Sequence, residues 1–61
     1  MPVIEIKLWE GRTREQKAAM ARRITEAVVE EGKTEPEHVH IIFSDYARSD
    51  WAIAGDLQDQ H

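Results

Sequence analysis

The chain has 61 residues with no cysteine, 12 acidic and 8 basic side chains, and a formal net charge of −4. This length allows one domain, residues 1–61, with a marginal core. The lack of cysteine excludes disulfides and thiolate metal sites. Oligomerisation is therefore the expected means of stabilising so small a chain. The excess of acidic residues argues against a nucleic-acid partner. The sequence has no long apolar run and no signal-peptide pattern, which argues against a membrane protein and predicts a soluble, cytoplasmic one.

Residues 3–9 alternate between two faces, which is typical of a β-strand. One face carries Ile4, Ile6 and Leu8, and the other carries Val3, Glu5, Lys7 and Trp9. Pro2 precedes this strand, where its missing N–H does no harm at a sheet edge. If Met1 is removed, Pro2 instead carries a free secondary amine. Burial among apolar and cationic groups would lower the pKa of that amine, so that it could act as a general base near neutral pH.

A helix is predicted from about Arg14 to Glu31, after a turn at residues 10–12. Thr13 is the expected N-cap, because Gln16 three residues later completes a capping-box pattern. Gly32 is expected to end the helix in the left-handed conformation. An apolar stripe and an i,i+4 ion pair are predicted on opposite sides of the helix: Met20, Ala21, Ile24, Ala27 and Val28 form the stripe, and Arg22 and Glu26 form the pair.

The second half of the chain predicts one further strand and a polar end. After a loop at residues 33–37, residues 39–44 alternate like a strand, with Val39, Ile41 and Phe43 on one face and His38, His40, Ile42 and Ser44 on the other. Residues 45–50 are polar and turn-like, residues 51–55 suggest a short extended segment, and the tail at 56–61 is expected to be mobile.

These elements predict an α+β fold, in which a β-α-β subunit has parallel strands joined by a right-handed crossover, followed by a short C-terminal extended segment. The helix covers one face of the sheet. The other face still carries Val3, Trp9 and Ile42, and a two-stranded sheet with such a face open is not stable alone. We therefore expect this face to pack against another copy of the chain.

Several short sequences, in order along the whole chain, resemble the 4-oxalocrotonate tautomerase family. They are Met1-Pro2 before the strand, residues 10–13 and 15–17 at the helix start, Pro36-Glu37, Ser44-Asp45, and residues 50–55. The resemblance implies a homo-oligomer, namely a hexamer built as a trimer of dimers. It also implies a cofactor-free isomerase that moves a proton on an enol or unsaturated 2-oxo acid, an activity associated with aromatic hydrocarbon catabolism.

The resemblance also implies roles for Pro2, Arg12 and Trp51, and two further candidates, Trp9 and His40, are considered beside them. Pro2 matches the catalytic base, and Arg12 matches the arginine that binds a substrate carboxylate, although a turn arginine is ordinarily just solvated. Trp51 matches an aromatic wall, or it serves packing alone, and Trp9 is expected to line the pocket and an interface. His40 stands where well-studied members carry a second arginine. Because histidine lacks the bidentate fork of arginine, it favours a monocarboxylate enol over a dicarboxylate.

Other functions remain open from the sequence. His38 and His40 have the spacing of a two-ligand metal site, but no third ligand is evident and no metal is expected. A hydratase or dehalogenase of the same superfamily would use a protonated prolyl amine as general acid. A ribbon-helix-helix repressor would need a helix at residues 39–44. The chain could also form a non-catalytic oligomer, which would need no active site.

Overall fold

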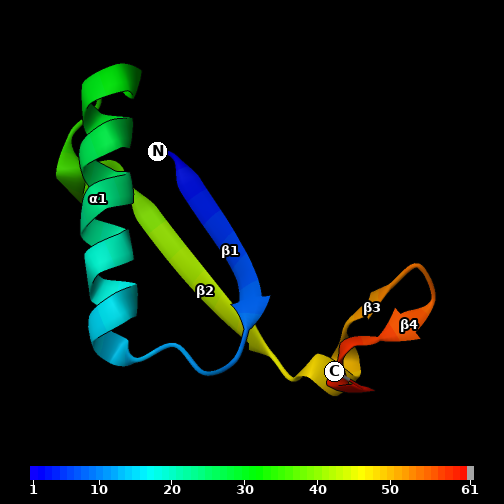
Figure 1. Ribbon diagram of the computed structural model, residues 1–61. Helices are drawn as coiled ribbons and strands as arrows, with labels where there is room; N and C mark the ends of the chain where they lie inside the picture. The colour runs from blue at the N-terminus through cyan, green and yellow to red at the C-terminus, as the bar shows by residue number, and fades with distance from the viewer. Residues whose placement is uncertain (61) are drawn as a thin grey trace.

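The computed structural model describes residues 1–60, and Figure 1 shows the arrangement of the elements. Strand β1 spans Val3–Trp9, helix α1 spans Arg14–Gly32, and strand β2 spans His40–Tyr46. A 3-10 turn, η1 (Pro36–His38), precedes β2. After β2 come η2 (Arg48–Asp50), the strands β3 (Ala52–Ile53) and β4 (Asp56–Leu57), and η3 (Gln58–Gln60). Residues 56–60, expected as a mobile tail, therefore form β4 and η3, and His61 lies outside the described residues.

Strands β1 and β2 pair in parallel, which confirms the predicted β-α-β fold. Their register runs from Val3 opposite His40 to Trp9 opposite Tyr46. The prediction that the second strand ends at Ser44 is wrong, because residues 45 and 46 continue the ladder beside the end of β1. Backbone pairing with a long partner strand thus outweighs the polar character of this stretch.

Helix α1 begins as the capping box predicts. The backbone N–H of Gln16 donates to Thr13 Oγ1 at 3.1 Å, and the Thr13 N–H donates to Gln16 Oε1 at 2.8 Å. The helix ends one residue later than predicted: Lys33, and not Gly32, adopts the left-handed conformation, with φ 53°. The Lys33 N–H donates to the carbonyl of Val29, so the reversal satisfies one of the free carbonyls at the helix end.

The inner face of α1 lies over the sheet and is half-buried. The side chain of Lys17 forms an ion pair with Asp45, which ties the first turns of α1 to the end of β2. Of the predicted apolar stripe, Ala27 is exposed, whereas the other four residues are half-buried: Met20, Ala21, Ile24 and Val28. The predicted pair between Arg22 and Glu26 is wrong, since the Lys17–Asp45 contact is the only ion pair within residues 1–60.

A short hairpin follows the sheet. Strands β3 and β4 pair antiparallel, with Ala52 opposite Leu57. The chain reverses at Ala54 and Gly55, whose φ angles are 53° and 84°. Two consecutive positive φ values are the requirement of the tight turns that match the twist of a hairpin. The segment at 51–55, which was expected to be extended, therefore contains the first strand of this hairpin and its turn.

The single chain has almost no closed core. Among residues 1–60, Leu8 is the one buried apolar side chain, at 9% exposure. Val3 and Ile42 on the open face of the sheet are 48% and 50% exposed. The radius of gyration is 14.6 Å, whereas a globular domain of this length has about 10.5 Å. The fold therefore needs further burial from outside the chain. No helix within residues 1–60 has the length and apolarity that crossing a bilayer requires.

Candidate functional site

Strand β1 separates the five candidate residues into two groups. Pro2 and His40 lie together at the start of the sheet, where the His40 N–H donates to the Pro2 carbonyl at 3.0 Å. Trp9, Arg12 and Trp51 lie at the other end. A strand of seven residues spans about 20 Å, so Pro2 cannot reach the second group within one subunit. Figure 1 shows this separation, with the N-terminus at one end of β1 and the β3–β4 hairpin beyond the other.

An aromatic cluster forms where the two strands end. Trp51 contacts Trp9 edge-to-face, with ring centroids 5.7 Å apart, and contacts Tyr46 with centroids 5.9 Å apart. Trp9 and Tyr46 are register partners in the sheet, which brings both rings to the same place. The N–H of Gln58 donates to the Trp51 carbonyl at 2.9 Å. Aromatic pairs of this geometry add about 0.5–1.5 kcal/mol each, so the cluster holds the C-terminal segment onto the sheet.

A pocket of about 300 Å³ opens beside this cluster. Its walls are formed by apolar and cationic side chains: Lys7, Leu8, Trp9, Arg12, Trp51 and Ile53. Gly11, with φ 122°, makes the turn that returns Arg12 toward the strand, where Arg12 Nη1 donates to the Trp9 carbonyl at 3.4 Å. A pocket of this size and lining suits a small anion with an apolar or conjugated body.

Two further cations lie at this end of the sheet and had no role in the sequence analysis. Lys7 lines the pocket. The alternation of β1 places Lys7 on the same side of the strand as Trp9, and this alternation was the sequence signal for its position. The guanidinium carbon of Arg48 lies 4.0 Å from the centroid of the Trp9 ring. No sequence signal joins Arg48 to Trp9, because the contact depends on how η2 turns back over the sheet.

The charge at this site is not neutralised within the described residues. In that part of the chain, no carboxylate forms an ion pair with Lys7, Arg12 or Arg48, although the whole chain has a net charge of −4. The indole Nε1 of Trp9 is buried and has no acceptor among residues 1–60. The site therefore offers unpaired positive charge beside an apolar wall.

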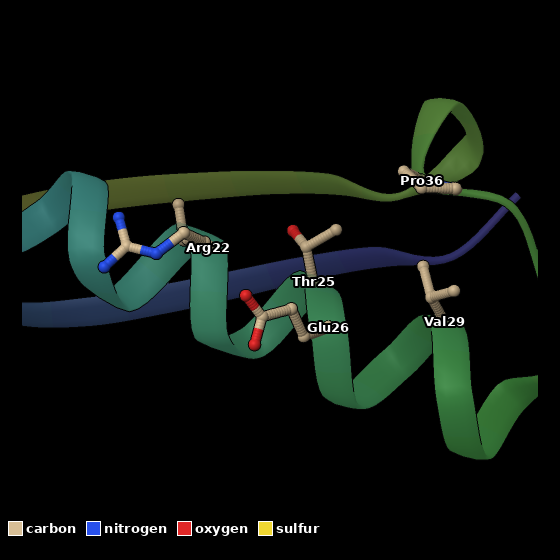
Figure 2. A pocket seen from close by; sticks show the side chains of 6 residues that line it. Arg22, Thr25, Glu26, Val29 and Pro36 are labelled. Atoms are coloured by element: carbon tan, nitrogen blue, oxygen red, sulfur yellow. The ribbon is translucent and has the colours of Figure 1, made fainter.

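A second groove, of about 410 Å³, runs along α1. Figure 2 shows Arg22, Thr25, Glu26 and Val29 following one another along the helix, with Pro36 of η1 across from Val29. Its floor is apolar, and its two charged residues are exposed at the rim. No aromatic wall and no candidate catalytic residue lies here, so the pocket at Arg12 is the better candidate for catalysis.

The two histidines do not share a strand face as predicted. His38 belongs to η1, and β2 begins only at His40, because Pro36 starts a 3-10 turn before the strand. Both side chains are exposed. Within residues 1–60, no three side chains of the types that bind metals come together.

Comparison with known proteins gives one consistent family. Residues 2–60 match the family model described as "Tautomerase enzyme". A probable tautomerase from Ralstonia nicotianae is 40% identical over 57 residues, which cover 93% of this chain and 88% of that protein. A structure of the 4-oxalocrotonate tautomerase isozymes from Methylibium petroleiphilum has a TM-score of 0.93 at 36% identity, covering 97% of this chain and 92% of that one. A heterohexamer 4-oxalocrotonate tautomerase from Chloroflexus aurantiacus has a TM-score of 0.92 at 27% identity, covering 98% and 97%.

Proposed function

The chain belongs to the tautomerase family, and on this basis we propose that it is a cofactor-independent isomerase acting on an enol or unsaturated 2-oxo acid. Pro2 is the general base. The observation that carries this proposal is the pocket in which Arg12 lies beside the Trp9 and Trp51 rings. The pocket puts the exposed Arg12 guanidinium, which suits a carboxylate, on the same lining as two aromatic rings, which suit the conjugated body of a small acid.

The chemistry begins with removal of Met1. In the chain as printed, the Pro2 nitrogen is part of the Met1–Pro2 peptide bond and has no basic lone pair. Once free, the amine takes the hydroxyl proton of the enol, the C=O bond forms, and the double bonds shift along the chain of the substrate. The same proton then returns to carbon, so the base is regenerated without a cofactor.

Arg12 binds the carboxylate of the substrate through paired hydrogen bonds and draws electron density toward it. The Trp9 and Trp51 rings exclude water, which strengthens this interaction by lowering the local dielectric. His40 lies beside Pro2 and orients a substrate oxygen near the base. Acting alone, a histidine there favours a substrate with one carboxylate.

Each active site is shared between subunits. Pro2 and Arg12 lie at opposite ends of β1, so the proline of one copy must meet the Arg12 pocket of another. The exposed apolar residues of the open sheet face provide a surface for this association. The Chloroflexus relative is a heterohexamer, and we propose a homo-oligomer here, a hexamer assembled as a trimer of dimers.

The alternative functions have less support. A hydratase or dehalogenase needs an acidic residue to activate water, and no carboxylate is among the described residues that line the pocket. Its prolyl amine would act as an acid, so its rate would fall as pH rises through the prolyl pKa, whereas a base gives a rate that rises. The ribbon-helix-helix alternative is ruled out by β2, which occupies the place of the required helix.

Replacement of the base tests the proposal. Pro2→Ala should lower kcat/KM for ketonisation of 2-hydroxymuconate by about 100-fold, since a positioned base contributes roughly 10²–10⁴-fold. Pro36→Ala is the matched control, because Pro36 lies in η1 beside α1, and it should stay within about twofold of the parent protein. Full activity in Pro2→Ala would refute the mechanism.

A further inference from the structure

Trp9 forms a wall of the candidate pocket, yet its own N–H group does not hold the ring in place. The Nε1 atom is buried and has no acceptor among residues 1–60, while the side chain as a whole is only half-buried. The orientation of the ring therefore depends on what touches its edge and its face. Trp51 packs against it edge-to-face, with ring centroids 5.7 Å apart.

Arg48 covers the face of the same ring. Its guanidinium carbon lies 4.0 Å from the centroid of the Trp9 ring, which is within the range of a cation–π contact. Arg48 is exposed and is not among the residues that line the pocket. No carboxylate within the described part of the chain forms an ion pair with Arg48, so none competes with the ring for the guanidinium. The contact of Arg48 with the pocket is thus made through Trp9.

The backbone of Arg48 adds a second connection, to the other aromatic wall. Arg48 begins η2, and its carbonyl accepts a hydrogen bond from the Trp51 N–H at 3.2 Å. One residue thus binds the backbone of Trp51 and the ring of Trp9, which lie far apart in the sequence and together line the pocket. The two connections are separable, because a side-chain substitution removes the stacking and keeps the carbonyl.

We propose that Arg48 is a positioning residue, which fixes the Trp9 ring by stacking on it and so preorganises one wall of the Arg12 pocket. The inference rests on the proposed function in one respect, since it takes this pocket as the substrate site. With Arg48 in place, the ring is ordered before a ligand arrives. Without Arg48, the ligand has to order the ring as it binds, and this cost lowers its affinity.

A spectrum of the ligand-free protein tests whether Arg48 fixes the ring. Two indoles in contact give an exciton couplet in the far-ultraviolet circular dichroism, and Trp9→Leu should abolish the part that comes from the Trp9–Trp51 pair. Arg48→Met, which keeps an unbranched side chain without the charge, should weaken the same couplet. Arg48→Lys keeps a cation and should restore part of it. Arg23→Met, an equal change at an exposed site on α1, should leave it unaltered.

Calorimetric titration of the Met1-free oligomer with sorbate, an unreactive conjugated monocarboxylate, tests whether the fixed ring matters for binding. Arg48→Met should raise the Kd about fivefold, because the ligand must then order one further side chain. In the Trp9→Leu background the same substitution should change the Kd by less than about twofold, because no ring is left to fix. A direct attraction between Arg48 and the carboxylate would persist in that background, so the double-mutant cycle separates the two roles.

Three results would overturn the inference: an unchanged couplet in Arg48→Met, an unchanged Kd in that variant, or an equal rise in Kd with and without the Trp9 ring. An Arg48 that only stabilised the fold would lower the melting temperature and leave the couplet and the Kd unchanged. Because sorbate does not react, neither measurement depends on catalysis. Both expected effects, in a protein that ketonises no enol, would support this inference and contradict the proposed function. An unchanged couplet in an active enzyme would overturn the inference alone.

Discussion

Trp9 connects most of the contacts that build the candidate site. Its carbonyl accepts a hydrogen bond from Arg12, its ring packs against Trp51, and its face carries Arg48. A sequence pattern could place Trp9 at the end of a strand and Arg12 in the following turn, because both depend on neighbours in the chain. It could not predict the stacking of Arg48, which requires the path of η2 in three dimensions.

Arg12 offers a prediction at the scale of a single residue. Arg12→Gln should raise KM for 2-hydroxymuconate by about 10–100-fold, because it removes a charge-assisted pair with the carboxylate. Steady-state kinetics of Met1-free protein measure this change. Arg14→Gln, two positions later at the exposed start of α1, is the control and should leave KM nearly unchanged. An unaltered KM in Arg12→Gln would show that the carboxylate binds elsewhere.

Helix α1 shows which element boundaries a sequence predicts well. Its start depends on two side chains, Thr13 and Gln16, whose capping pattern is local and was confirmed. Its end depends on which residue takes the left-handed conformation. Gly32 was the natural candidate, yet a Cβ built on Gly32 would meet only Val28 Cγ1, at 3.9 Å, so nothing there requires glycine. Lys33 makes the reversal with a side chain poorly suited to it.

The helix end can therefore be improved by one substitution. Lys33→Gly should stabilise the protein by roughly 0.5–1 kcal/mol, because glycine adopts positive φ without the steric cost of a Cβ. Thermal unfolding at fixed protein concentration would measure the gain, since the melting point of an oligomer depends on concentration. Lys33→Ala removes the same charge but keeps the Cβ, and it should give no comparable gain. A lower melting temperature for Lys33→Gly would contradict the assigned cap.

The whole molecule is unusual in leaving its apolar residues uncovered. The sheet has one face under α1 and one face open, and the hairpin exposes Ile53 and Leu57 at 52% and 42%. The sequence predicted the parallel pair, the crossover helix and the open face, because each follows from alternation and helical periodicity. It did not predict the hairpin, whose two-residue strands are too short to show a pattern.

Assembly is the prediction at this scale. Sedimentation velocity at micromolar concentration should show a species several times the 7.1 kDa of the chain. Ile42→Asp should dissociate and unfold it, because a charge would then be buried in the interface that covers the open face. Ala27→Asp, on the exposed side of α1, is the control and should assemble normally. A folded 7.1 kDa monomer would contradict both the assembly and the shared active site.

The central claim is that the free amine of Pro2 moves the proton, and the comparison of two forms of the same chain tests it most directly. Ketonisation of 2-hydroxymuconate and phenylenolpyruvate would be followed by ultraviolet absorbance, with protein whose intact mass shows Met1 removed or Met1 retained. We predict rates well above buffer for at least one enol only in the form without Met1, because retention locks the Pro2 nitrogen in an amide. Equal rates in both forms, or no rate in either, would contradict a prolyl base.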